Sequence, residues 1–403
     1  TCLYSTDLVY FFPRQLFIFT MSGPSEGNTI FCLDFFKVLN EDFASKNIIF
    51  SPLSISAALG MVLLGARGNT QTQIQKVSII KSFVLYLHVY YQCDTPGGIH
   101  SQFHDILSAI NKPTTSYELA IANRLYGEKT FHFLQQYLVC IQKMYQAELK
   151  PTDFRNAAEE TREEINLWVE SFTKGKIKDL FAPRTLSAAT KLVLVNAVYF
   201  KGQWAVKFKK EETWEELFHV NETTSRPVQM MHHLGNYKIA KIEEHHCQVL
   251  ELPYKGGDLS MYILLPNDYA GLTQELTYEK LTTWISPEHL KEDKVKVSLP
   301  RFKIETFAAL TKYLQALGMT DAFNPAESDL SGIAEGLLVS EAVHKAYIEV
   351  NEEGTEAAAA TGITVGVTSV RIHGEFVADH PFLFFITHQK TKSILFFGRF
   401  SSP

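Results

Sequence analysis

Residues 352–376 read EEGTEAAAATGITVGVTSVRIHGEF. From Thr355 to Val367 every second residue is small or apolar, whereas the residues between them are mixed and suit a solvated face. This period of two is typical of a strand that is half-buried in a sheet, and Gly362 and Gly366 oppose the helix that four alanines alone would favour. The stretch therefore has the pattern of a β-strand.

The surroundings of this stretch are those of a loop. It lies between two stronger strand patterns, AYIEV at 346–350 and PFLFFI at 381–386, with no turn residue before Gly374. A plain connection of this length would be unusual in a compact domain, and long loops are often functional. The stretch is predicted to have two states, exposed first and inserted between strands of a sheet later. The alternative is an ordinary edge strand followed by a flexible tail.

Composition excludes several classes of protein. The chain has 403 residues, 46% of them hydrophobic, and 29 phenylalanines, which excludes disorder and allows one large domain or two fused lobes. The net charge is −6 and lysines alternate with acids, so the sequence offers no basic stripe for nucleic acid. No nucleotide-binding or nucleophile motif is present, and an enzyme is not expected.

The cysteines and histidines predict neither a disulfide framework nor a metal site. The five cysteines are odd in number, widely scattered and without a CxxC spacing, which fits a reducing compartment. The adjacent pair His232 and His233 would point to opposite faces of a strand, and the HHC run at 245–247 lacks a partner at a metal-ligand spacing. We expect no metal and no cofactor.

Two segments are out of character. Residues 1–20 contain an apolar run broken by Pro13 and Arg14 with no basic start, so we expect a non-native extension rather than a signal peptide or anchor, and Met21 as the natural start. Residues 77–97 combine aromatic and β-branched residues without helical or strand spacing. They are interpreted as a mispredicted piece of sequence, with a hydrophobic binding segment as the alternative.

Helices are predicted early in the chain and strands late. Ser51 and Pro52 read as an N-cap and first-turn proline before an apolar, buried helix. Ile165, Trp168 and Val169 follow the spacing of a helix that covers a flat surface. After residue 190, short β-branched and aromatic runs predominate, which indicates an α+β protein.

Many motifs in order resemble the serpin family, and within it the ovalbumin-like clade B, from Met21 to Pro403 except residues 77–97. The similar segments are IIFSPLSISAALGMVLLGARGNT, INLWVESFTKGKIKDLF, LVNAVYFKGQW, LPRFKIE, VHKAYIEVNEEGTEA, ADHPFLFFI and SILFFGRFSSP. The resemblance implies a single serpin domain over 21–403, with three β-sheets, about nine helices and an exposed reactive-centre loop at about 354–376. In inhibitory members a protease cleaves this loop, which then inserts into the main sheet and traps the acyl-enzyme.

The resemblance also implies roles for individual residues. Counted from Gly354, the reactive bond lies between Thr368 and Ser369, which suits an elastase-like protease, and Arg371 is an alternative, trypsin-like site. The hinge comprises Gly354, Thr355, Glu356, Ala357, Ala358, Ala359, Ala360 and Thr361. Thr355 and Ala357 to Ala360 match the inhibitory pattern, because no charged or bulky side chain among them blocks the start of insertion. The resemblance also implies a polar cluster beneath the opening sheet, which we call the shutter; its residues are Ser51, Ser54, Asn196 and His344. Insertion begins at a second site, the breach, which contains Trp204.

The expected function is therefore that of a serine protease inhibitor acting as a suicide substrate. The partner is an elastase-like protease, with trypsin-like and cysteine proteases as alternatives. We expect a monomer without nucleic-acid or membrane partners, in the cytoplasm and also outside cells without a cleaved signal peptide. The rival function is that of a non-inhibitory storage, binding or chaperone-like serpin whose loop is cleaved without trapping.

Overall fold

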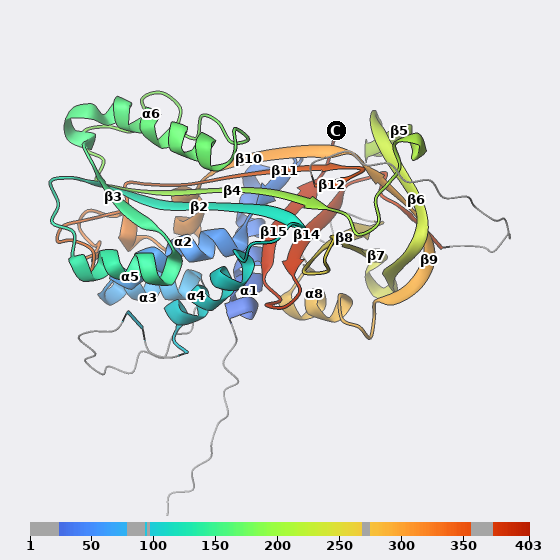
Figure 1. Cartoon of the computed structure of the whole chain (residues 1–403), viewed down its shortest axis with the longest axis horizontal. Coiled ribbons are helices and arrows are strands. Elements are labelled where there is room, and N and C mark those ends of the chain that lie inside the picture. Colours follow the sequence, from blue (N-terminus) through green and yellow to red (C-terminus); the bar gives the residue numbers. More distant parts are fainter. Residues whose placement is uncertain (1–23, 79–92, 95–96, 268–274, 356–373) are drawn as a thin grey trace, which may run out of the picture.

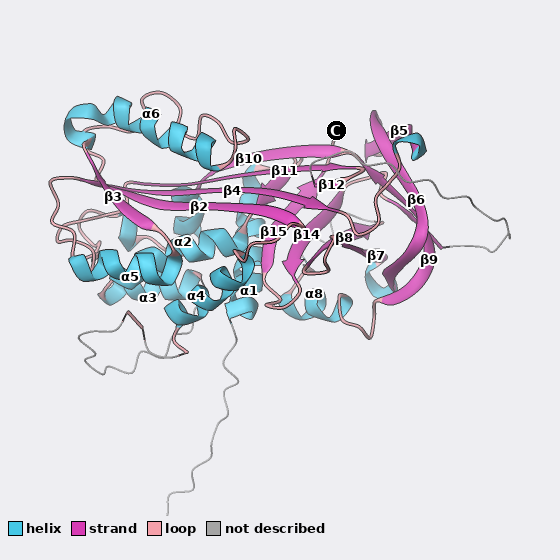
Figure 2. Cartoon of the chain, in the orientation of Figure 1, coloured by secondary structure: helices cyan, strands magenta, loops and turns pink. Residues whose placement is uncertain are grey.

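The computed structural model of the chain describes residues 24–78, 93–94, 97–267, 275–355 and 374–403. Within them lie eight α-helices and fifteen strands (Figures 1 and 2). The helices are α1 (Pro24–Asp42), α2 (Pro52–Gly65), α3 (Gly68–Val77), α4 (Ile99–Ile110), α5 (Gln135–Tyr145), α6 (Phe154–Phe172), α8 (Tyr278–Trp284) and α9 (Leu310–Ala316). The predicted extension 1–20 and most of the segment 77–97 lie outside the described residues.

The predicted buried helix and its cap are confirmed. Ser51 caps α2, its hydroxyl accepting from the Ser54 backbone N–H, and Pro52 occupies the first turn. All but one residue of α2 are buried, as a helix that is apolar on every side requires.

Six strands form the sheet that carries the hinge. Its order is β10-β11-β12-β4-β2-β3. The strands are β2 (Tyr117–Glu128), β3 (Glu148–Thr152), β4 (Leu192–Gln203), β10 (Phe302–Ala309), β11 (Glu341–Asn351) and β12 (Gly354–Thr355).

Nine further strands form the second sheet, in the order β1-β15-β14-β8-β7-β6-β9-β13, with β5 paired to β6. They are β1 (Ile48–Phe50), β5 (Thr213–Asn221), β6 (Thr224–Ile242), β7 (Cys247–Pro253), β8 (Leu259–Pro266), β9 (Lys291–Pro300), β13 (Gly374–Val377), β14 (Phe382–His388) and β15 (Ile394–Phe400). The resemblance implied three sheets, whereas the described strands form two hydrogen-bonded networks. The long strand β6 pairs with β5 over residues 224–231 and with β7 over residues 238–242, so it joins these strands into one network.

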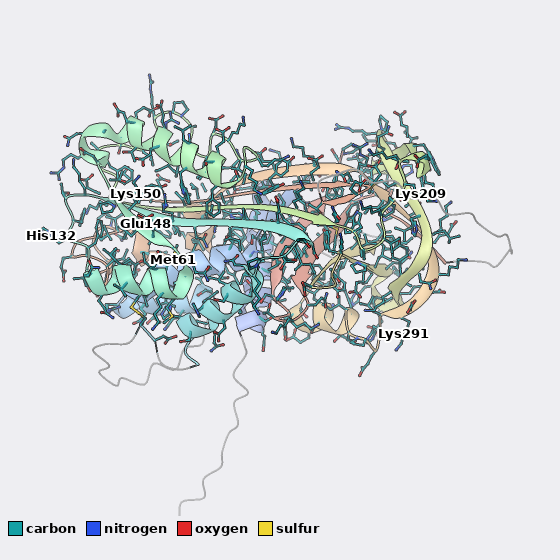
Figure 3. The ribbon with its side chains drawn as sticks, viewed as in Figure 1. Met61, His132, Glu148, Lys150, Lys209 and Lys291 are labelled. Atoms are coloured by element: carbon teal, nitrogen blue, oxygen red, sulfur yellow. A yellow bond between two sulfur atoms is a disulfide. The ribbon has the colours of Figure 1, made fainter. Side chains whose placement is uncertain are left out.

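Helices cover both faces of the six-stranded sheet. Helices α2 to α5 lie on one face and α6 lies on the other (Figure 1). Ile165 and Val169 of α6 are fully buried against the sheet, as the sequence pattern predicts. Lys150 on β3, labelled in Figure 3, forms an ion pair with Glu164 on α6, so the helix and the sheet are also joined by a contact at the surface.

The cysteine prediction is wrong in one respect: Cys93 and Cys140 form a disulfide between the segment before α4 and α5. The two residues are 47 positions apart, and only the packing of α5 beside residue 93 brings the sulfur atoms together, so spacing could not reveal the pair. Cys32 and Cys247 are buried and unpaired. In the described part of the chain, no helix is long and apolar enough to span a membrane.

Candidate functional site

The main sheet is closed along a seam between β4 and β11. Residues 341–347 of β11 pair directly and in parallel with residues 193–199 of β4. Beyond Tyr347 the two strands separate, and the two-residue strand β12 lies between them. The first hinge residues therefore already occupy the position that an inserted loop would extend along the seam.

Thr355 is held at this position by an aromatic pair. It is fully buried, and its hydroxyl lies 2.8 Å from the Tyr254 hydroxyl. Burial raises the pKa of Tyr254, which keeps that hydroxyl protonated. Tyr254 stacks on Trp204 with ring centroids 4.6 Å apart, and the Trp204 indole N–H donates to the Asn351 carbonyl at 3.0 Å. The residue that sequence places at the breach thus bonds to the turn that leads into the hinge.

Gly354 is required by its backbone. Its φ of 142° lies in the region that favours glycine. A Cβ atom at this position would lie 2.1 Å from the Gly202 carbonyl oxygen and 2.7 Å from the Gln203 Cα atom. Both neighbours are backbone atoms of β4 and cannot rotate away, so only glycine lets the chain turn into the seam here.

The acidic turn before Gly354 is anchored on both sides. The backbone N–H of Trp204 donates to the Glu353 carbonyl, and the backbone N–H of Phe208 donates to the Glu352 carbonyl, each at 3.0 Å. The Glu353 carboxylate also forms an ion pair with Lys207, and Glu352 lies 3.6 Å from Arg301. These contacts fix the turn that leads to Gly354.

The predicted shutter residues are brought together under the seam. Asn196 on β4 lies opposite His344 on β11, and their side chains are hydrogen-bonded. The Asn196 amide donates to the Ser54 carbonyl at 3.1 Å, and the His344 Nε2 accepts the Ser51 N–H at 3.1 Å. This network joins both strands of the seam to the first turn of α2, so separating the strands breaks it.

His344 is neutral in this network. Its Nε2 accepts from a backbone N–H, which leaves Nδ1 as the donor to the Asn196 side-chain oxygen. The side chain is fully buried, and burial lowers its pKa to about 3. A protonated ring would lose the Ser51 bond and place an uncompensated charge beneath the sheet.

This pKa predicts a loss of stability in mild acid. Below about pH 6.5 the unfolded chain binds a proton on His344 that the folded chain excludes, so the contribution is complete above this pH and declines as the pH falls toward 3. At pH 5 the expected loss is about 2 kcal/mol. Urea unfolding of the protein and of His344→Gln between pH 8 and pH 5 measures it, and equal declines for both would contradict the prediction.

Two residues of the site could not be identified from sequence. Asn123 on β2 lies opposite Asn196 and accepts a hydrogen bond from its amide, extending the shutter to a third strand. Tyr254 completes the breach. Asn123 carries no local signal, because the β2–β4 register alone puts it beside Asn196. Tyr254, in the segment LELPY, could have been noted as a motif residue but not as the partner of Thr355.

Several predicted site residues lie outside the described residues. They are the reactive-bond residues Thr368 and Ser369, the alternative site Arg371, and the hinge residues Glu356, Ala357, Ala358, Ala359, Ala360 and Thr361.

The adjacent histidines His232 and His233 contact different neighbours. His232 stacks on Trp214 and its Nδ1 lies 2.9 Å from the Ser298 hydroxyl, whereas His233 contacts Tyr237. Within the described residues, no three His, Cys, Asp or Glu side chains lie close enough together to hold a metal ion.

Comparison with known proteins agrees with this geometry. Residues 26–403 match the family described as Serpin (serine protease inhibitor). Serpin B4 of Homo sapiens is 49% identical over 392 residues, covering 95% of this chain and 100% of the relative. Leukocyte elastase inhibitor of Equus caballus is 47% identical with the same coverage.

A solved structure agrees as well. Uncleaved ovalbumin superposes with a TM-score of 0.86 at 40% identity, over 95% of this chain and 100% of the other. The seam, the hinge and the shutter lie within residues 26–403, which match the family. This chain therefore belongs to the serpin family, within the ovalbumin-like clade B.

Proposed function

We propose that this protein inhibits elastase-like serine proteases as a suicide substrate. The observation that carries the proposal is the position of β12: the loop enters the sheet between β4 and β11, and its first buried side chain is the small, uncharged Thr355. An inserting strand can extend from this point without first expelling a charge. The 47% identity to a leukocyte elastase inhibitor supports the protease class.

In the proposed mechanism, the protease serine attacks the Thr368 carbonyl and forms an acyl-enzyme, while Ser369 leaves with the free amino group. The loop from Thr355 onward then inserts between β4 and β11 and gains ladder hydrogen bonds on both sides. Insertion carries the bound protease away before water hydrolyses the ester. The seam contacts along 341–347 must break first.

The reactive bond is assigned to Thr368–Ser369 by the count that the serpin family follows from the glycine at the base of the hinge. Here that glycine is Gly354, and fourteen further residues reach Thr368. A small β-branched residue preceded by Val367 fits a shallow apolar pocket. Arg371 is the second site, because its use would lengthen the inserted segment by three residues.

The rival proposal is a non-inhibitory serpin that stores or binds other molecules, and it has support in the similarity to ovalbumin. The small, uncharged Thr355 at the start of the hinge favours inhibition over this rival.

We propose action in the cytoplasm and, without a cleaved signal peptide, outside cells. The Cys93–Cys140 disulfide supports an oxidising location for part of the protein's life.

The test is incubation of the protein with neutrophil elastase and, separately, with trypsin, followed by denaturing gels and mass spectrometry. A complex with elastase that survives denaturation, cleaved after Thr368, is the expected result. The variant Arg371→Ala should leave elastase trapping unchanged and abolish any complex with trypsin. Cleavage by both enzymes without a complex and without a rise in thermal stability would replace the proposal with the rival.

A further inference from the structure

The segment between α6 and β4, residues 173–190, lies over the seam, and we call it the strap. Four of its apolar side chains are buried: Ile177, Leu180, Phe181 and Leu186. They belong to one hydrophobic cluster with Val195 and Tyr199 of β4 and with Val343 and Tyr347 of β11. The strap and α6 therefore cover both strands that must separate when the loop inserts.

The backbone of the strap is strained. Lys174, Asp179 and Arg184 have φ values of 54°, 48° and 65°, and none of them is glycine. These are three of the six such residues in the described part of the chain. Strained conformations persist only where surrounding contacts hold them, so the strap requires an anchor.

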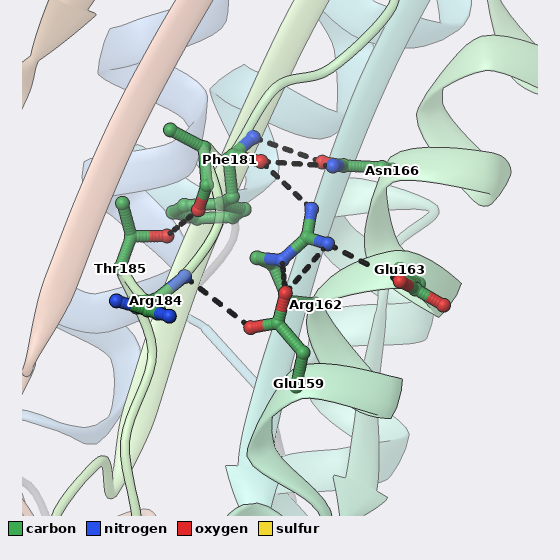
Figure 4. A network of polar contacts seen from close by, with 8 residues as sticks. Glu159, Arg162, Glu163, Asn166, Phe181, Arg184 and Thr185 are labelled. Atoms are coloured by element: carbon green, nitrogen blue, oxygen red, sulfur yellow. Dashed lines mark hydrogen bonds and ion pairs between the residues drawn. The ribbon is translucent and has the colours of Figure 1, made fainter.

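The anchor is a set of hydrogen bonds to the backbone of one residue, Phe181, which we call the grip. Asn166 on α6 accepts the Phe181 N–H at 2.8 Å and donates to the Phe181 carbonyl at 2.9 Å. Arg162, one turn earlier on α6, donates to the same carbonyl at 3.0 Å (Figure 4). Both side chains are buried, with 8% and 7% of their surface exposed. Glu159 holds the guanidinium at 2.8 Å and also accepts the Arg184 N–H.

We propose that Asn166, with Arg162, is a positioning residue that sets the rate of loop insertion by gripping the backbone N–H and carbonyl of Phe181. While the grip holds, the strap and α6 lift only as one body, and this body is tied to the sheet by Ile165, Val169 and the Lys150–Glu164 pair. Without the grip the strained strap lifts alone and uncovers the seam. The inference rests on the proposed insertion mechanism, but its test needs no protease.

The test uses a synthetic peptide of residues 355–368, TEAAAATGITVGVT, added to the intact protein. Entry of this peptide into the seam is followed by the rise in thermal stability over time. In Asn166→Ala the two buried hydrogen bonds to the Phe181 backbone are lost, so we expect entry of the synthetic peptide to be about tenfold faster than in the unchanged protein. Asn166→Asp keeps an acceptor for the Phe181 N–H but loses the donor, and an intermediate rate is expected.

Two controls separate the grip from a general loss of stability. Asn156→Ala changes the same residue type on the same helix, where the side-chain amide donates to the Asp153 carboxylate. Leu281→Ala weakens the core at α8, across the molecule from α6 (Figure 1). Both should take up the peptide at the unchanged protein's rate, although Leu281→Ala lowers the unfolding temperature.

The outcomes distinguish the two proposals. Equal or slower uptake by Asn166→Ala, or equal acceleration by Leu281→Ala, overturns the grip and leaves the proposed function standing. No uptake by any variant overturns both the grip and the insertion mechanism. Faster uptake by Asn166→Ala, an intermediate rate for Asn166→Asp and unchanged rates for both controls support the grip.

Discussion

A Thr355→Arg variant will be cleaved by its target protease at an unchanged rate but will no longer trap it. Position 355 is fully buried between β4 and β11, against the Tyr254 hydroxyl. An arginine there finds no acid among the contacts of Thr355, and burying an unpaired charge costs several kcal/mol. Insertion then stops at its first step, and deacylation releases active protease. We expect the number of inhibitor molecules consumed per protease to rise at least about tenfold, because each 1.4 kcal/mol is a factor of ten.

The measurement is a titration of elastase with the inhibitor, together with denaturing gels for the covalent complex. Thr355→Val is the matched control, because it keeps the size and neutrality of the side chain and loses only the hydroxyl bonded to Tyr254. It should retain trapping. If Thr355→Arg traps elastase as well as the unchanged protein does, loop insertion does not require a neutral side chain buried at position 355.

An Asn196→Ala variant will lose stability and form inactive or polymeric protein on mild warming. The substitution leaves the Ser54 carbonyl, the Asn123 side-chain oxygen and the His344 Nδ1 without their shared partner beneath the seam. Buried groups without partners cost about 1–3 kcal/mol each, so a loss of about 3 kcal/mol is expected. The loss falls on the strands that open for insertion, and a seam that opens unprompted accepts its own loop or that of another molecule.

Urea unfolding measures the loss, and size-exclusion chromatography after warming detects the polymers. Asn28→Ala is the control: Asn28 is also buried and bonds to the Ile394 carbonyl and to Ser56, but it lies on α1, away from the seam. It should lower stability without producing polymers. Polymers from both variants in equal amount would mean that any buried asparagine has this effect and that the shutter has no special role.

Local patterns in the sequence were sufficient for much of the fold. Ser51, Pro52 and the apolar run after them predict the capped, buried helix α2, and the spacing of Ile165 and Val169 predicts a helix lying on a sheet. These features depend on residues within a few positions of one another, where helical and strand periodicity directly determine which side chains share a face. Phe172 is the exception: it continues the apolar spacing but is 44% exposed beside Trp168, because it lies at the last residue of α6.

The sequence by itself determined the family, the strand-like pattern of residues 355–367, and the uncharged residue at position 355. Tertiary structure alone decided which groups meet: Thr355 with Tyr254, Asn123 with Asn196, Cys93 with Cys140, and Asn166 with the Phe181 backbone. The physical reason is that these contacts depend on strand register and helix packing across 15 to 101 positions of chain. A register shift of one residue would turn every such side chain to the other face of the sheet, and no local pattern specifies that register.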